Sequence, residues 1–532
     1  MFKKYGDYIL NLLVPAFVFG SVTGVLTSLA VNLYKWGVHH VVHGSERIYS
    51  RLSEKPWLIA VAVLAVSAIA LLFSLIYRKM PDLRGGGIPT SIGILRGLIV
   101  FRWLIHLIGT VTLSLISFFI GVPLGNEGPS VHMGTAIGKG SVHILAKKHR
   151  AWDRYSMTGG ACAGFSVSLG APVSGILFSI EEAHQRISPM IMIVSATSVM
   201  FAKITTDIIA PVLGVSPTLF PKMEFLTLAV KDIWIPLVIG IALGALAVAF
   251  LSYYRTVNNF FNSKFKKIPH CVKLIAVFVC TVILGSVSFN FVSTGHELII
   301  SLFDNSLPVW LMLIILAVRA TLTLSATSNG VTGGIFLPTL AVGALLSGVI
   351  GRILTGFCGL QGEYYAIVMV LGITACISGM MKMPLTAIVF TVEAFGGYAN
   401  ILYIVFTAVV SFAITEVFGV KSINDSVLEH RIEELTTRTK PKVLDAFVTV
   451  KAHSFAIGKQ IRDIFWPANL FVLSLKKNNL HGAQVDEHGG KEIKEGDVLH
   501  VRYSTVNETQ TRQELLAIVG EQDYEENAVE SV

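Results

Sequence analysis

The residues of this chain best suited to chemistry are one carboxylate and three glycine-rich loops in apolar surroundings. Glu127 stands in the sequence Gly-Asn-Glu-Gly-Pro at 125–129. The other loops read Gly-Gly-Gly-Ile-Pro at 85–89 and Gly-Gly-Ile-Phe-Leu-Pro at 333–338. Glycine followed by proline near a first helical turn leaves backbone N–H groups unpaired at the positive end of the helix dipole. Several such ends meeting at one point would bind an anion without a full positive charge.

Glu127 suggests a gate within this anion site. A carboxylate in an apolar region is costly and usually faces a cavity where it has a function. At a helix N-terminus it occupies the place that an anion would take, and its protonation would vacate that place. We therefore expect a gate coupled to protons. The alternatives are that Glu127 is a loop residue reaching the membrane interface, and that the glycines only allow helices to pack closely.

Two further carboxylates follow an apolar stretch at 173–180. Glu181 and Glu182 are adjacent, and one of them could accept a proton on the cytoplasmic side. The alternative is that both lie at the interface and are only solvated. We expect His132 to be a packed histidine rather than a proton relay, and Glu393 to be structural.

The composition indicates that a membrane surrounds most of the chain. Of 532 residues, 53% are hydrophobic and 14% charged, and the mean hydropathy is +0.66, whereas about a quarter of a soluble domain is charged. Several apolar runs approach the roughly 20 residues of a spanning helix, and shorter ones resemble the discontinuous helices that line transporter cavities. The runs are 9–31, 57–76, 104–120, 190–201, 233–251, 274–289, 307–318 and 401–417. We predict an all-α polytopic membrane protein.

The membrane part contains an internal repeat with a constant offset. Five residues recur after 212 positions, so that Ala163, Pro172, Ile176, Phe178 and Glu181 match Ala375, Pro384, Ile388, Phe390 and Glu393. Such repeats in transporters commonly have inverted topology and hold the substrate site at their interface. We therefore expect two related, inverted halves.

The polarity of the chain changes after about residue 425, where the apolar runs stop. We divide the chain into a transmembrane domain at 1–431, a small α+β domain at 441–520 and an acidic tail at 521–532. For the small domain, the patterns predict strands at 446–450, 470–475 and 497–503 and helices at 457–465 and 508–518.

The basic residues indicate the orientation of the chain. They cluster at 3–4, 147–150 and 264–267, and the positive-inside rule places these segments and both termini in the cytoplasm. The net charge of +8 reflects this bias. Because no basic patch with interleaved aromatic residues is present, we expect no nucleic-acid partner.

The three glycine motifs, in this order, resemble those of the CLC family of chloride channels and chloride/proton antiporters. That family's motifs read GSGIP, GREGP and GGIFxP, and this chain has GGGIP, GNEGP and GGIFLP. The likeness covers most of 8–430 and implies a homodimer with an independent pore in each subunit. It implies that Glu127 is the gating glutamate and Glu182 the internal proton-transfer glutamate typical of antiporters. The arginine before the gating glutamate is replaced by Asn126.

The resemblance also implies the anion site. The backbone N–H groups of Ile335 and Phe336 would coordinate the central anion, with Gly86 and Gly128 in the same site. The family's coordinating serine is Gly86 here, and its coordinating tyrosine is Asn424. We expect Gly86 to remove a donor and widen the site, whereas Asn424 could still donate through its amide. The preference among chloride, nitrate, fluoride and other anions stays open.

The small domain, 447–503 in particular, resembles the TrkA C-terminal domain of potassium-transport regulators, a ligand-sensing and dimerising module. Its own ligand is not evident from the sequence.

The sequence thus predicts a proton-coupled antiporter of chloride or a related small anion in the inner (plasma) membrane, without cofactor, metal or enzymatic activity. The expected partners are the anion, protons, the lipid bilayer, a second copy of the chain and a small-molecule ligand of the C-terminal domain. The alternatives are a passive voltage- or pH-gated chloride channel, a fluoride/proton exchanger and a non-transporting sensor. An intramembrane enzyme with Ser166 or Ser168 as nucleophile is a further one.

Overall fold

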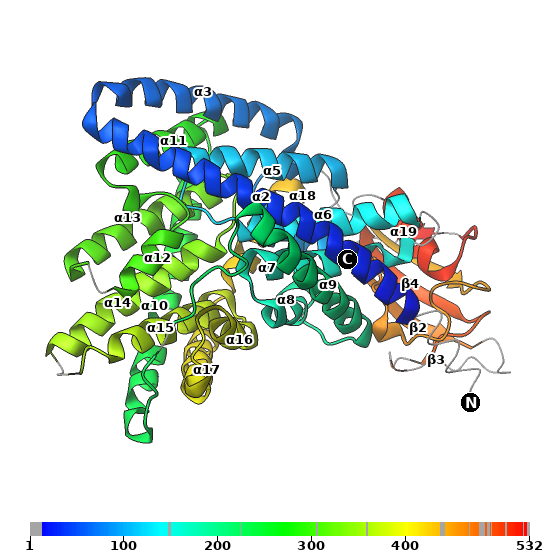
Figure 1. The fold of residues 1–532 in the computed structure, drawn as a ribbon. Helices are drawn as coiled ribbons and strands as arrows, with labels where there is room; N and C mark the ends of the chain where they lie inside the picture. The colour runs from blue at the N-terminus through cyan, green and yellow to red at the C-terminus, as the bar shows by residue number, and fades with distance from the viewer. Residues whose placement is uncertain are drawn as a thin grey trace.

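The structure is a computed structural model with a large helical part and a small sheet-containing part beside one end of it (Figure 1). It describes residues 13–99, 101–146, 150–223, 225–304, 307–357, 360–436, 442–467, 469–477, 485–486, 490, 492–505, 508–524 and 526–528.

Long apolar helices make up most of the helical part. Among the described residues, ten are long and apolar enough to cross a membrane. They are α2 (Val14–Glu54), α3 (Trp57–Lys79), α5 (Trp103–Ile120), α9 (Pro189–Leu213), α10 (Trp234–Asn259), α11 (His270–Val287), α13 (Val309–Ser328), α14 (Phe336–Phe357), α15 (Tyr364–Met381) and α17 (Ile401–Val417). Each predicted apolar run falls on one of them where both are described, but several helices extend well beyond the run, since α2 ends at Glu54 and α9 at Leu213 whereas the runs end at 31 and 201. The chain is a polytopic, all-α membrane protein with a small additional domain.

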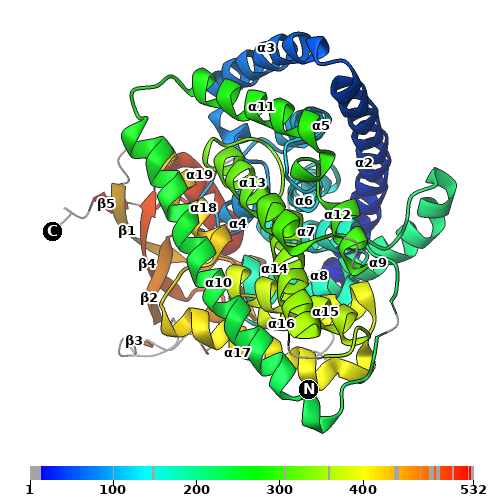
Figure 2. The ribbon, with the colours of Figure 1, turned by 90° about the vertical axis from the view of Figure 1, so that its left-hand side faces the viewer.

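The other α-helices of the described helical part are either shorter than these or, like the 19-residue α6, less apolar. They are α4 (Ile88–Leu95), α6 (Glu127–Leu145), α7 (Asp153–Leu169), α8 (Pro172–Phe178), α12 (His296–Phe303), α16 (Pro384–Phe395) and α18 (Ile423–Thr436). Glycines let α6 and α7 touch through their backbones, because a methyl group on Gly134 would lie only 1.9 Å from the carbonyl oxygen of Gly160. Figure 2 shows α2 and α10 on opposite sides of the bundle, with α13 and α14 between them.

The two halves of the repeat meet through α8 and α16. Glu393, near the end of α16, accepts hydrogen bonds from the backbone N–H groups of Val173 (2.8 Å) and Ser174 (2.9 Å) at the start of α8. Glu181, just after α8, accepts them in the same way from Leu385 (2.8 Å) and Thr386 (2.7 Å) at the start of α16. Each helix therefore ends beside the beginning of the other, as the inverted repeat requires. The structural role predicted for Glu393 is confirmed, and Glu181 shares it.

The Glu393 carboxylate caps the start of α8, and removing it is expected to destabilise the contact between the halves. In Glu393→Ala, two backbone donors and the Ser174 hydroxyl lose a charged acceptor, which should cost about 2 to 4 kcal/mol of stability. The thermal unfolding midpoint of the detergent-purified protein measures this loss. Glu416→Ala is the matched control, since it removes a half-exposed ion pair with Lys382 worth less than about 1 kcal/mol. Equal midpoints for the two variants would contradict the assigned role.

The small domain is a five-stranded sheet with one helix. The strand order is β3-β2-β4-β1-β5, with antiparallel neighbours. The strands are β1 (Lys442–Thr449), β2 (Leu470–Lys476), β3 (Val485–Asp486), β4 (Val498–Thr505) and β5 (Glu526–Ala528), and the helix is α19 (Glu508–Val519). The core lies between α19 and one face of the sheet, where Leu515 and Ile518 pack with Val448 and Val501.

Most predicted elements of this domain are confirmed, and one is wrong. The strands predicted at 446–450, 470–475 and 497–503 correspond to β1, β2 and β4, and the predicted helix at 508–518 to α19. The helix predicted at 457–465 is reduced to a 3-10 turn at Ile461–Asp463. Gly458 has a φ of 76°, which is incompatible with a right-handed helix. Strand β5 falls within the segment interpreted as an acidic tail, where it pairs with β1.

Candidate anion and proton site

The three glycine loops meet at one point inside the helical part. Gly125 and Gly334 exchange two backbone hydrogen bonds of 2.7 Å, although 209 positions separate them. The loop at 85–89 joins them, because Gly85 donates to the carbonyl oxygen of Gly330 (2.9 Å). Helices α4, α6 and α14 all begin at this cluster. Their first N–H groups, which have no partner within the helix, therefore converge as the sequence predicts.

The contacts at this point exclude any side chain on Gly128. A methyl group there would lie 2.6 Å from Cα of Gly334 and 3.1 Å from Cα of Gly87. Ile335 and Phe336, which lead into α14, are buried beside these glycines. Four of the five predicted anion-site residues, Gly86, Gly128, Ile335 and Phe336, thus belong to one cluster of helix ends.

Glu127 is the first residue of α6 and is fully buried. Its carboxylate turns back toward the glycine cluster, since a methyl group on Gly125 would lie 2.1 Å from its Oε2 atom. Neither carboxylate oxygen makes a hydrogen bond with any described residue. The acid therefore lies at the helix ends without being fixed there.

Two cavities with basic residues reach this cluster from opposite sides. One, of about 490 Å3, is lined by Asn126 and Leu337 beside Glu127, and by Lys35, His296 and Arg319. The other, of about 40 Å3, is lined by Gly85, Gly333 and Ile335, and by Arg84 and Arg431. Helix α11 begins at His270, whose ring nitrogen lies 2.9 Å from the carbonyl oxygen of Asn329 in the smaller cavity, and ends next to the larger one. The two cavities therefore lie toward opposite ends of α11, with the glycine cluster between them.

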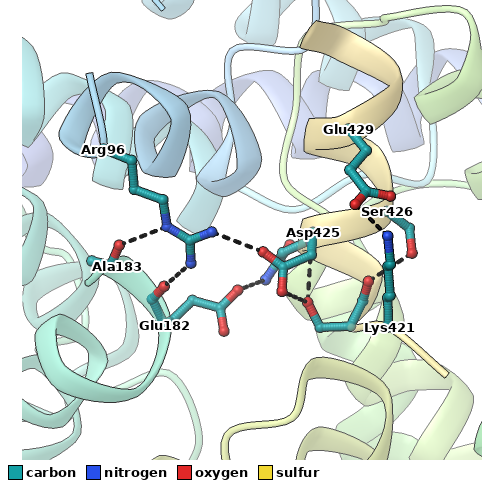
Figure 3. Close-up of polar contacts among 9 residues, drawn as sticks. Arg96, Glu182, Ala183, Lys421, Asp425, Ser426 and Glu429 are labelled. Carbon is teal, nitrogen blue, oxygen red and sulfur yellow. Dashed lines mark hydrogen bonds and ion pairs between the residues drawn. The ribbon is translucent and has the colours of Figure 1, made fainter. Parts of the chain in front are cut away.

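Glu182 is buried at a second polar site near the smaller cavity, where Asn424 holds it. The Asn424 side-chain amide donates to the Glu182 carboxylate at 2.9 Å. Arg96 donates to the backbone carbonyl oxygens of Glu182 (2.9 Å) and Ala183 (3.1 Å) and pairs with Asp425 (3.1 Å) (Figure 3). Glu182 and Asn424, which we expected to act separately in proton transfer and in anion binding, are therefore bonded to each other. The interpretation of Glu182 as a solvated interfacial acid is wrong, because it is only 2% exposed.

The family of the chain follows from a match that covers most of the membrane part. Residues 69–416 match the family model described as voltage gated chloride channel. The chain belongs to this CLC family. It is 27% identical over 452 residues to the H(+)/Cl(-) exchange transporter ClcA of Yersinia pestis bv. Antiqua (strain Angola), which covers 83% of this chain and 91% of that protein. It is also 27% identical to ClcA of Salmonella newport (strain SL254), over 79% of this chain and 88% of that protein.

Solved CLC structures share the fold. A slow cyanobacterial Cl-/H+ antiporter has a TM-score of 0.71 at 23% identity, over 79% of this chain and 98% of its own. A CLC-type fluoride/proton antiporter has a TM-score of 0.60 at 18% identity, over 76% and 96%. A eukaryotic CLC transporter has a TM-score of 0.64 at 16% identity, over 86% and 79%.

Gly86 stands where the CLC motif has its coordinating serine, and its surroundings differ from those we expected. Gly86 has a φ of 37°, and a methyl group on it would lie 2.8 Å from Cγ2 of Thr332 and 3.3 Å from the hydroxyl of Thr110. Gly86 therefore does not open space here, contrary to our expectation from the sequence. The Thr110 hydroxyl is buried and has no hydrogen-bond partner among the described residues. Nothing in the sequence around Thr110, in the middle of α5, indicates this location.

A buried pair of histidines adjoins the glycine cluster. His132 lies 3.1 Å from the Ser91 hydroxyl and 3.2 Å from a ring nitrogen of His106, and Ser91 donates to the carbonyl oxygen of Gly87. His132 is thus packed, as predicted, with a polar neighbour at each ring nitrogen. His106 was not singled out from the sequence, because a single histidine in the apolar run of α5 gives no signal of its partner on α6.

Proposed function

We propose that this protein exchanges a small inorganic anion for protons across the inner (plasma) membrane. One observation supports this most strongly: the buried carboxylate of Glu127 lies, without a hydrogen bond to any described residue, where three helix N-termini meet. The curated relatives with 27% identity are H(+)/Cl(-) exchange transporters, and this supports the same function.

In this proposal the anion and the Glu127 carboxylate compete for the same helix ends. The N–H groups before α14, at Ile335 and Phe336, and the start of α6, at Gly128, stabilise one negative charge at a time. When an anion binds, it displaces the carboxylate toward the larger cavity, where Glu127 takes up a proton. When the neutral side chain releases that proton, it returns as a carboxylate and expels the anion.

Glu182 carries the proton on the other side. It is buried, and its bond to Asn424 places it next to the smaller cavity lined by Val427 and Arg431 of the same helix, α18. An acid in this position provides a route for protons that is separate from the anion path. A passive channel needs no such second acid, so the passive chloride channel is the less favoured alternative.

Two side chains bear on which anion is carried. The Thr110 hydroxyl lies next to the space of the missing CLC serine, and we propose that it donates to the anion in place of that serine. Asn424 stands where the family has a tyrosine, but its amide is engaged by Glu182. Chloride is the proposed substrate. Fluoride is the second candidate, because the hydroxyl donors that the family's serine and tyrosine supply are replaced here by Gly86 and Asn424.

We further propose that two copies assemble and that both termini are cytoplasmic. The sheet face that points away from α19 carries the exposed side chains Phe447 and Phe471. Because exposed apolar side chains on one face favour association, this face supports a dimerising domain like the TrkA C-terminal domain.

The test is a paired recording of anion and proton movement in proteoliposomes. A chloride gradient should drive protons against their own gradient, and a fluoride gradient should be compared in the same vesicles. Chloride movement without any proton movement would favour the passive channel. Absence of flux for every anion from folded protein would favour a non-transporting sensor.

A further inference from the structure

An apolar groove of about 400 Å3 lies between the neighbouring helices α11 and α13 (Figure 2). Small, exposed side chains form it, namely Ala276 and Cys280 on α11 and Ala317 on α13. On the same two helices, the larger side chains of Ile283 and Leu313 are nearly half exposed. Because both helices are long and apolar enough to cross a membrane, the groove faces the hydrocarbon of the bilayer. None of the residues assigned above to the anion or proton path lines it.

The groove has about the length of one leaflet of the bilayer. On α11 it runs from Ala276 to Leu284, a rise of about 12 Å along the helix. One leaflet contributes about 15 Å to the hydrocarbon core. The two helices are antiparallel, because His270 at the start of α11 lies 2.9 Å from the carbonyl oxygen of Asn329, just after the end of α13. An acyl chain of one leaflet therefore fits along the groove.

Lysines lie at the end of the groove that is nearest the start of α11. Lys273 precedes Ala276 by one helical turn, and its ammonium group donates to the carbonyl oxygen of Phe261 (2.7 Å), which lines that end. Lys266 and Lys267 lie just before α11 and are exposed. Ammonium groups bind phosphate through charged hydrogen bonds, and basic segments beside spanning helices attract anionic lipid headgroups. The charge at this end therefore complements an anionic phospholipid.

The same end of the groove adjoins the glycine cluster. Ser325 lines the groove, and its carbonyl oxygen accepts a hydrogen bond from the side-chain amide of Asn329 (2.8 Å). The next residue, Gly330, accepts the bond from Gly85 that joins two of the glycine loops. An acyl chain packed beside Ser325 would therefore support the end of α13, from which the third glycine loop begins.

We propose that this groove binds an anionic phospholipid of the inner leaflet, with one acyl chain between α11 and α13 and the phosphate on Lys266 and Lys267, and that this lipid stabilises the fold. The assignment to the inner leaflet rests on the orientation proposed above, whereas the binding itself does not.

The acyl-chain site is tested by thermal unfolding of the full-length, delipidated protein in a neutral detergent. Phosphatidylglycerol should raise the unfolding midpoint saturably by several degrees, because it binds the folded state. Phosphatidylcholine with the same acyl chains should have little effect. Ala317→Phe fills the groove and should abolish the response to phosphatidylglycerol. Ala68→Phe, at an exposed alanine of α3 outside the groove, is the matched control and should respond as the wild type does.

The headgroup site is tested by titrating phosphatidylglycerol in the same assay. The double variant Lys266→Gln/Lys267→Gln should weaken the apparent affinity roughly 30-fold, since each lysine near a membrane surface contributes a factor of about five. The matched control is Lys451→Gln/Lys494→Gln, which removes the same charge from exposed positions of the small domain and should bind normally. These four lysines are exposed, so this test stands even if Ala317→Phe does not fold.

Four outcomes would overturn the proposal. Equal stabilisation by phosphatidylglycerol and phosphatidylcholine would indicate only the lipid that surrounds any membrane protein. Equal responses of Ala317→Phe and Ala68→Phe would place the lipid outside the groove, and equal affinities of the two double variants would remove the headgroup contact. Glycerol phosphate as effective as the lipid would exclude the acyl chain. Because no transport is measured, failure of the proposed exchange would leave these results standing.

Discussion

In Glu127→Gln, proton transport should fall by roughly 10²-fold, to the background leak of the vesicles, while the anion continues to move at a rate that no longer depends on pH. Glutamine has nearly the shape of glutamate but carries no proton that it can release. It also bears no negative charge to compete with the anion for the helix ends. The buried site should accept the change, because neither carboxylate oxygen is hydrogen-bonded to a described residue.

The matched control is Glu297→Gln. Glu297 lines the same larger cavity, but its side chain is 83% exposed. Its neutralisation should leave both coupling and pH dependence close to those of the wild type. If Glu127→Gln kept proton transport, or if both variants behaved alike, Glu127 would not be the gate.

In Glu182→Gln, the anion should still move and remain sensitive to pH, whereas proton transport should fall by about 10²-fold. The reason is that Glu182 lies away from the glycine cluster. It is held by Asn424 and not by the helix ends. Glutamine can keep the bond to Asn424 after a flip of either amide, so the local structure should persist. Simultaneous chloride-electrode and pH-electrode recording from one vesicle preparation measures both fluxes.

Glu181→Gln separates this effect from general damage to the same segment. Glu181 is adjacent in sequence, but its carboxylate caps α16 through Leu385 and Thr386. The variant should unfold at a lower temperature and yet keep the wild-type ratio of protons to anions. Loss of coupling in Glu181→Gln, with coupling retained in Glu182→Gln, would reverse the assignment of the two acids.

The sequence was sufficient to predict much of the helical architecture, because spanning helices need long apolar runs and few other structures do. It missed α14 and α15 as apolar runs. Helix α14 follows directly on a glycine-rich loop, and both helices contain glycines, such as Gly343 and Gly372, that interrupt the apolar pattern and provide close helix contacts. The repeat was predictable because Glu181 and Glu393 occupy matching positions in the sequence, and their matching bonds in the structure confirm it.

The details of the site were less predictable, because they depend on contacts between distant segments. The bond between Glu182 and Asn424 joins residues 242 positions apart, and no local pattern around either residue indicates the other. The same holds for Thr110 beside Gly86. The meeting of the glycine loops was expected only in outline, since the hydrogen bonds between Gly125 and Gly334 require the complete fold.

The most direct test of this account is equilibrium anion binding as a function of pH, measured by isothermal titration of chloride, and of fluoride in parallel, into the wild type and Glu127→Gln. If the carboxylate and the anion compete for the helix ends, wild-type affinity should fall as pH rises and Glu127 loses its proton. The glutamine variant should bind the anion at least as tightly, with an affinity that does not change over the same pH range. An identical pH dependence in the two proteins would contradict the competition on which the proposed exchange depends.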